Sequence, residues 1–471
     1  METFIILLGA GAYFVFALFR LEYAVLWLSL FFPLYLVKGE FSGVPFTLTE
    51  VLIYVTAFAF FLHWIFRVIT PTGRFSGLFR GIRELIAPKE SFFHRYKNLL
   101  IGVSFFVIAA FLTLLITQSE LTLIDGQTFP GMRVALGILK GWIVAPILYL
   151  ILLLAVLRSS RQALHVLNGY TLSAVILGLW GLYQMLTHNY VTPDGRASGP
   201  FESANYLALF ITPALLYTVI RLREAFFPHR MEKMKMTEAS LIVAAGLVLL
   251  CALLVTKSYA AMFAFFISAA FYFGLEYWGC IKKKIRKGLP WKFLIGALLS
   301  LLVIVVAVYF IDPTKWQAMF QFAQRNSSSV RIEVYTIAFG LLADNWLLGI
   351  GMGQFPAFYQ IEAVTILGHV PYEWNMLHPH NLYLALWLNL GLLGFASFLF
   401  IVALALQQVW SHCRQFAAEK LVNIGKMRVL AFSLLLVALL HGFFDTPFFK
   451  NDLSLLFWMI IALMFAVKEE K

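Results

Sequence analysis

Charged residues are scarce in this sequence of 471 residues: Asp, Glu, Lys and Arg make up 13% of the chain, and hydrophobic residues make up 61%. Soluble globular domains average about 25% charged and about 45–50% apolar residues, so this shortage of charge excludes an ordinary soluble fold. The mean hydropathy of +0.83 agrees with that conclusion. Apolar runs long enough to cross about 30 Å of hydrocarbon recur along the whole chain and leave little room for a soluble domain.

Several chemical signatures are missing as well. The three cysteines, Cys251, Cys280 and Cys413, lack metal-ligand spacing and are predicted to be packing residues. Paired carboxylates, zinc-type clusters and a Gly-x-Ser-x-Gly elbow do not occur, so a hydrolase is not supported and no metal site is predicted. The segment 349–353, Gly-Ile-Gly-Met-Gly, follows no buried strand and is predicted to be a turn rather than a nucleotide-binding loop.

The apolar runs predict an all-α polytopic membrane protein with about 12–13 transmembrane helices. We treat residues 1–471 as a single membrane domain. The number of spans depends on the first two runs, which are short and divided only by Arg20-Leu21-Glu22. The predicted spans are 3–19, 23–37, 48–69, 98–117, 134–157, 163–187, 204–222, 238–256, 260–278, 291–311, 382–409, 429–444 and 453–468.

Positive charge gathers in five polar segments that alternation places on one side of the membrane. By the positive-inside rule this side is cytoplasmic. The net charge of +12 therefore reflects topology and does not indicate binding to nucleic acid. The basic run 282–287 is expected to lie against anionic lipid headgroups. The five segments are 70–97, 158–162, 221–237, 279–292 and 411–428.

The largest segment on the opposite side is the extracytoplasmic loop 312–380, which is far longer than a common connection and rich in aromatic residues. We expect it to fold as a partly helical cap. Ser329 is the expected N-cap of a helix over 330–342, which places Arg331 in the first turn. A cation is disfavoured there, so Arg331 either meets an anionic ligand or is a surface side chain, solvated or paired with Glu333 or Asp344.

Three other basic residues lie near the outer face. Arg196 belongs to a Gly- and Pro-rich segment over 192–205, and it either points at the same volume as Arg331 or caps carbonyls in a turn. Lys257 lies in a very short turn between two spans. Lys140 is the one basic residue placed inside a span, where it is either functional or extends to the interface.

Histidines provide the candidate bases. In His378-Pro379-His380-Asn381, the loop meets a hydrophobic helix, so the sequence places a group that titrates near neutral pH at the membrane surface. An imidazole there can accept a proton from a sugar hydroxyl. His441 and Asp445 are four residues apart near the last outer turn, and on one helical face the carboxylate would either orient the imidazole or form a structural pair.

The order of these motifs resembles that of the O-antigen ligase and O-antigen polymerase family. Arg-Ala-Ser-Gly-Pro-Phe-x-x-x-Asn begins at Arg196, Ser-Ser-x-Arg ends at Arg331, and His380-Asn381 is followed after nine residues by Gly391-x-x-Gly394. The resemblance covers about residues 130–465 and includes the long outer loop.

The resemblance implies a glycosyltransferase C-like fold and a metal-independent, inverting transferase with no cofactor. Such an enzyme moves a glycan from an undecaprenyl pyrophosphate carrier to an acceptor, with His380 as the base and Arg331 as the loop arginine. Many relatives carry Ser-Arg-Gly where this chain has Lys257-Ser258-Tyr259. Lys257, alone or with Arg196, would then supply the second cation for the pyrophosphate.

The sequence does not choose the acceptor. A lipid A core sugar, another lipid-linked repeat unit and a protein hydroxyl would make the chain a ligase, a polymerase or a protein O-oligosaccharyltransferase. A lipid-linked glycan flippase or transporter is an alternative from another class, although internal repeats and interrupted helices are not evident. Each of these functions implies a multi-pass protein of the bacterial cytoplasmic membrane, and the transferases would have an active site on the extracytoplasmic face.

Overall fold

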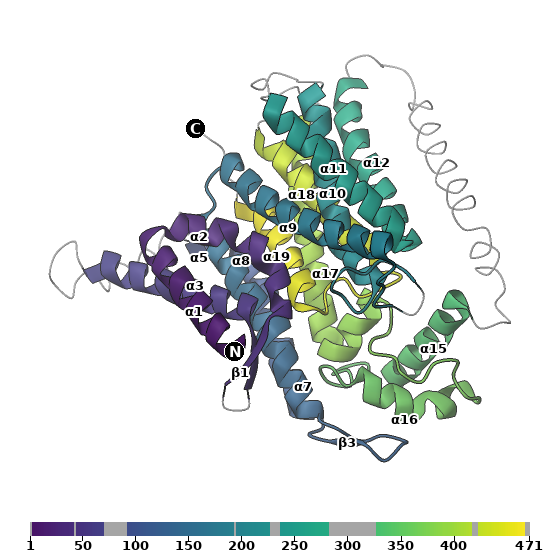
Figure 1. Cartoon of the computed structure of the whole chain (residues 1–471). Coiled ribbons are helices and arrows are strands. Elements are labelled where there is room, and N and C mark those ends of the chain that lie inside the picture. Colours follow the sequence, from purple (N-terminus) through teal and green to yellow (C-terminus); the bar gives the residue numbers. More distant parts are fainter. Residues whose placement is uncertain are drawn as a thin grey trace.

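A computed structural model of the chain describes residues 2–41, 44–69, 92–192, 195–226, 236–281, 326–416 and 423–466. These residues are almost entirely helical, with two short antiparallel hairpins (Figure 1). Eight of the described helices are long and apolar enough to cross a membrane. The predicted all-α polytopic membrane fold is therefore confirmed.

The N-terminal half begins with α1, which packs against α3, and it holds five of the eight candidate membrane spans. Its elements are α1 (Glu2–Phe19), α2 (Leu21–Trp27), the 3₁₀ helix η1 (Leu28–Leu36), β1 (Lys38–Phe41), β2 (Val44–Thr47), α3 (Leu48–Ile69), α5 (Phe92–Arg95), α6 (Lys97–Ile116), β3 (Leu121–Thr122), β4 (Thr128–Phe129), α7 (Gly131–Ile138), the π-helical turn η2 (Leu139–Val144), α8 (Ala145–Val156), α9 (Ser160–Thr187) and α10 (Ala204–Phe226).

The C-terminal half holds the elements that carry most of the candidate site. These are α11 (Met236–Thr256), α12 (Tyr259–Ile281), α15 (Ser327–Asn345), α16 (Phe355–Leu367), α17 (Leu382–Phe416), α18 (Asn423–His441) and α19 (Asn451–Ala466). Every predicted span within the described residues coincides with a helix or helical run, and the predicted span 291–311 lies outside them. The first two runs form helices shorter than a full span.

The apolar core is centred on α19, which is buried along almost its whole length and packs against α8 and α18. Trp458 of this helix is fully buried among Phe106, Phe448 and Phe457. A helix that is apolar on all sides needs partners on all sides, and here protein helices surround it. The turn that precedes α19 is therefore held firmly in place.

Helices α15 and α16 form a separate lobe beside α17 (Figure 1). This lobe has its own apolar cluster, which includes Val334, Ile337, Tyr359 and Leu388. The helices expected in the loop 312–380 are present in its described part, residues 326–380. The apolar cluster joins α15 directly to α17, and so fixes the position of Arg331 relative to the start of α17.

Gly391 explains part of the Gly-x-x-Gly motif. It has φ 64° and ψ −174° within α17, where the helix kinks. A β-carbon here would lie 2.5 Å from the carbonyl oxygen of Leu347, so the lobe could not approach the helix as closely. The kink lets Leu392 N–H donate to that same carbonyl at 2.9 Å. The turn 349–353 docks beside it, as the hydrogen bond from Ile350 N–H to the Leu388 carbonyl shows.

We expect Gly391→Ala to destabilise the protein by about 1–3 kcal/mol or more, because alanine is strained at positive φ and its β-carbon meets a backbone atom. Thermal unfolding in detergent measures the change. Gly137→Ala is the matched control, since Gly137 is helical and a β-carbon there meets nothing within 4 Å. Equal unfolding temperatures for the two variants would contradict this account of the kink.

Candidate functional site

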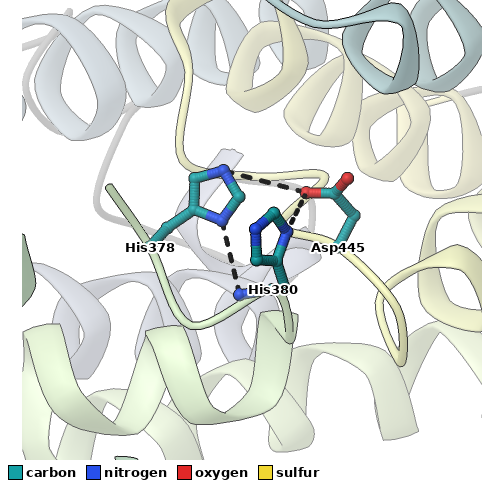
Figure 2. Close-up of side chains that lie close together, drawn as sticks. All are labelled: His378, His380 and Asp445. Carbon is teal, nitrogen blue, oxygen red and sulfur yellow. Dashed lines mark hydrogen bonds and ion pairs between the residues drawn. The ribbon is translucent and has the colours of Figure 1, made fainter. Parts of the chain in front are cut away.

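Two histidines and an aspartate converge where the loop before α17 meets the turn between α18 and α19. Figure 2 shows both imidazoles directed at one carboxylate oxygen. His378 Nε2 lies 3.9 Å and His380 Nδ1 lies 3.8 Å from Asp445 Oδ1. The two rings lie edge to face, with centroids 4.4 Å apart. The structure thus joins residues that are 65 positions or more apart in the sequence.

The His-Asn pair is positioned by a helix cap. Asn381 Oδ1 accepts hydrogen bonds from Tyr383 N–H at 2.9 Å and Leu384 N–H at 3.1 Å, so Asn381 is the N-cap of α17. His380 precedes it with φ 47°, a left-handed conformation that costs energy for a residue other than glycine. Tyr335 Oη from α15 donates to the His380 carbonyl at 3.0 Å. Asn381 therefore has a positioning role next to the histidine.

Both nitrogens of His378 are engaged. Its Nδ1 accepts the backbone N–H of His380 at 3.3 Å, so the neutral ring carries its proton on Nε2, which lies 2.9 Å from the hydroxyl of Tyr206. Burial, together with the positive charges of His380, Lys450 and Arg331, lowers the pKa of His378 to about 4, against the opposing effect of Asp445. His378 is therefore neutral near pH 7 and lacks a free nitrogen.

His380 has the complementary arrangement. Its Nδ1 faces Asp445, which favours the tautomer with the proton on Nδ1. Among the described residues, no group hydrogen-bonds to its Nε2, and its side chain is 27% exposed. Its Nδ1 has no hydrogen-bond partner among them either, so Asp445 acts on it through its charge at 3.8 Å. His380 thus offers a lone pair to an incoming group, whereas His378 does not.

Asp445 is almost completely buried, with 2% of its surface exposed. Its Oδ2 accepts a hydrogen bond from Asn205 Nδ2 at 3.0 Å, and its Oδ1 accepts one from Thr446 N–H at 2.8 Å. Burial raises the pKa of the carboxyl, but the neighbouring His380, His378 and His441 lower it by more, so the pKa lies well below its usual value. Asp445 is therefore an ionised carboxylate in a nearly dry environment.

Arg196 is connected to this carboxylate through one side chain. Its guanidinium donates to Asn205 Oδ1 at 2.9 Å and to the Thr256 carbonyl, at the end of α11, at 2.7 Å. Capping of a neighbour's carbonyl was one of the two roles predicted for Arg196. Lys257 follows Thr256 directly, with φ 49° and an exposed side chain. Arg196 therefore lies beside the turn that holds Lys257, and Asn205 connects Arg196 to Asp445.

The cap of α15 differs from the prediction. The N-cap is Asn326, not Ser329, because Asn326 and Ser329 form a reciprocal capping box. Arg331 therefore lies in the second turn, and it donates back to the hydroxyl of Ser327 at 2.6 Å. Within the described residues, Arg331 pairs with neither Glu333 nor Asp344, and its Nε has no hydrogen-bond partner. One turn after Arg331 in α15, Tyr335 donates to the His380 carbonyl, and the positive charge of Arg331 contributes to the lowered pKa of His378.

Two predicted residues have different surroundings from those expected. Lys140, in η2, lies 3.0 Å from the buried carboxylate of Glu50, so it forms an ion pair within the helix bundle. His441 is fully buried, and neither ring nitrogen has a hydrogen-bond partner among the described residues. The expected helical pairing of His441 with Asp445 is absent, because α18 ends at His441 and the following turn directs Asp445 to His378 and His380.

Sequence reasoning did not single out Tyr206 or Lys450. Tyr206 follows the motif residue Asn205, and Lys450 lies in the last turn before α19, so only proximity to other motifs could have signalled them. Both lie beside His378: Tyr206 through its hydroxyl, and Lys450 through its contact with the Tyr206 ring.

The same three side chains could hold a metal ion. One ligand atom each from His378, His380 and Asp445 lies within 4.8 Å of the other two. However, His378 Nε2 already bonds to Tyr206, and both carboxylate oxygens of Asp445 accept hydrogen bonds. A metal would have to replace some of these contacts, so the donors present suit an Asp-His pair better than a metal centre.

The protonation of His378 predicts a pH dependence of stability. The pKa of this group is about 4 in the folded protein and near 6.5 when unperturbed, so the unfolded chain binds more protons between these values. Stability should fall as the pH drops from about 6.5 toward about 4. His378→Gln should flatten this part of a plot of unfolding temperature against pH, while His165→Gln, at an exposed position in α9, should leave it as in the parent. A parental slope in His378→Gln would contradict the burial argument.

Part of the chain matches a known protein family. Residues 244–399 match the model of the O-antigen ligase family, and this segment contains Lys257, Arg331, His378 and His380. No curated protein matched the chain significantly. The family and the membrane helices together support a glycosyltransferase-type enzyme of the membrane. The resemblance predicted from the motifs is confirmed over residues 244–399, the part of the chain that matches the O-antigen ligase family model.

Proposed function

We propose that this protein transfers a glycan from undecaprenyl pyrophosphate to a hydroxyl acceptor on the extracytoplasmic face of the bacterial cytoplasmic membrane. The observation that carries the proposal is the free Nε2 of His380, beside a buried, ionised Asp445. Because nucleotide sugars are cytoplasmic, transfer on the outer face requires a lipid-linked donor. The distribution of positive charge between the loops supports this orientation of the site.

In the proposed reaction, His380 Nε2 removes the proton of the acceptor hydroxyl while the oxygen attacks the anomeric carbon. The bond from that carbon to the pyrophosphate oxygen breaks in the same step, so the configuration inverts and undecaprenyl pyrophosphate leaves. Asp445 acts as a positioning residue, since it holds the Nδ1–H tautomer and stabilises the imidazolium that forms. Asn205 and Arg196 hold Asp445 in turn.

Cations stabilise the negative charge that develops on the leaving pyrophosphate. Arg331 is suited to this role because its Nε is buried without a hydrogen-bond partner among the described residues, and because its charge reaches the histidines. Lys257 supplies a second positive charge from the exposed turn after α11. Arg196 is largely committed to Asn205 and Thr256, so we assign it to positioning more than to phosphate binding.

The decisive experiment follows release of undecaprenyl pyrophosphate by purified protein in nanodiscs, with a lipid-pyrophosphate-linked oligosaccharide as donor and candidate acceptors. His380→Ala should reduce the rate by about 10²–10⁴-fold, the usual contribution of a general base. His378→Gln is the matched control and should retain activity within about tenfold, because its hydrogen bonds position the loop without taking the proton.

Three results would overturn this proposal in different ways. Comparable losses in both variants would remove the distinction between the two histidines. Substantial activity in a folded His380→Ala protein would exclude His380 as the base. Movement of the donor between leaflets, with no undecaprenyl pyrophosphate released by the wild type under any acceptor, would indicate a flippase.

Chelation tests the assignment of His378, His380 and Asp445 to an Asp-His pair. We expect the rate of undecaprenyl pyrophosphate release to survive prolonged dialysis against EDTA, because a metal bound by these three residues would have to replace hydrogen bonds of His378 and Asp445. The measurement is the initial rate before and after dialysis. Loss of activity that Zn²⁺ or Mn²⁺ restores would reassign the three residues as metal ligands.

A further inference from the structure

Lys450 is held in a cage of aromatic rings next to His378. Its Nζ lies 3.9 Å from the ring centroid of Tyr206, 4.1 Å from that of Phe201 and 5.3 Å from that of Tyr35. Tyr35 and Phe201 are themselves stacked, with an interplanar angle of 11°. The rings come from η1, from the loop before α10 and from α10 itself, so three parts of the chain fix one ammonium group.

The hydrogen-bonding capacity of this ammonium is unused. Lys450 is only partly exposed, yet among the described residues its Nζ has no hydrogen-bond acceptor and no carboxylate at ion-pair distance. Contact with aromatic faces stabilises a cation but takes none of its three N–H donors. The hydroxyl of Tyr35 is also buried without a hydrogen-bond partner in the described part of the chain. Unsatisfied donors in such a place indicate a site for a ligand that supplies oxygen atoms.

The surrounding charges keep the cation available. Burial lowers the pKa of Lys450, and the carboxylates of Asp452, Glu202 and Asp445 oppose that shift, while Lys38 adds to it. These carboxylates act from a distance, so they favour the charged form without occupying its donors. A lysine that served only as a structural counterion would instead contact one of them directly, as Lys140 contacts Glu50 at 3.0 Å.

We infer that Lys450, with Tyr35, Phe201 and Tyr206, forms an anion subsite that binds a phosphate or carboxylate group of one of the two substrates. The inference rests on the proposed glycosyl transfer. The group is either the pyrophosphate of the donor or an acidic substituent of the acceptor glycan. Both groups carry anionic oxygens that can accept hydrogen bonds from the Lys450 ammonium. The aromatic rings beside the ammonium can also pack against the apolar face of a sugar.

The test measures binding, separately from turnover, in a His380→Ala background. Undecaprenyl pyrophosphate and uncharged undecaprenol serve as donor-side probes. A neutral oligosaccharide and its carboxylate-bearing counterpart serve as acceptor-side probes. Lys450→Met removes the charge with little change in length, and Lys450→Arg retains the charge. Lys38→Met is the matched control, because Lys38 is an exposed cation near the cage but is not part of it.

Loss of a charged hydrogen bond should weaken binding of the true ligand by about 10–100-fold in Lys450→Met. Weaker binding of undecaprenyl pyrophosphate, with undecaprenol and both oligosaccharides unchanged, would assign the subsite to the donor. Weaker binding of the acidic oligosaccharide alone would assign it to the acceptor. Lys450→Arg should lose less than Lys450→Met in either case, and Lys38→Met should match the parent.

Unchanged affinity for every probe in folded Lys450→Met would overturn the inference. If that variant fails to fold, Lys450→Gln is measured in its place, under the same criteria. Release of undecaprenyl pyrophosphate by the wild type distinguishes failure of the subsite from failure of the proposed transfer. A wild type that releases it, combined with Lys450 variants that bind normally, would defeat only the subsite, whereas a wild type that never releases it would defeat the proposed transfer.

Discussion

The buried carboxylate of Asp445 is the constraint on which the candidate site depends. An ionised group with 2% exposure costs several kcal/mol to remove from water unless hydrogen bonds and opposite charges compensate. Here Asn205 from α10, the backbone of the turn after α18 and the two histidines before α17 supply that compensation. The carboxylate therefore holds three distant segments together, and in doing so fixes the imidazole of His380.

The basic residues around the histidines differ in how their hydrogen-bond donors are used. Arg196 uses its donors on Asn205 and Thr256 and so stabilises the framework. Arg331 and Lys450 have donors that no described residue uses, and both lower the pKa of His378. A purely structural core would not be expected to leave hydrogen-bond donors unused beside a neutral imidazole, because each buried donor without a partner lowers the stability of the fold. They are consistent with a site that is completed by an anionic substrate.

The sequence predicted the helices well and the contacts of the site only in part. Long apolar runs need no tertiary information, so most of the described helices could be placed to within a few residues, although eight of them rather than 12–13 are long and apolar enough to cross a membrane. The N-cap of α15 was wrong because Asn326 and Ser329 are both good caps, and only the reciprocal bonds decide between them. The partner of Asp445 could not be predicted, because it depends on where α18 ends. Lys450 belongs to no recognisable motif. The aromatic rings around it come from residues up to 415 positions away, so the sequence near Lys450 could not reveal them.

The segment that matches the O-antigen ligase model holds the proposed base and the N-cap Asn381 beside it, but not the carboxylate that selects the tautomer of the base. His380 and Arg331 lie within residues 244–399, whereas Asn205, Asp445 and Lys450 lie on either side of it. The proposed proton transfer needs the tautomer that Asp445 selects, so the matched segment cannot provide the site by itself. The flanking helices must be packed before His380 is oriented. Lys450 and the aromatic rings around it also lie outside the matched segment. Substitutions at the proposed subsite can therefore change which substrate is bound while His380 and Arg331 stay the same.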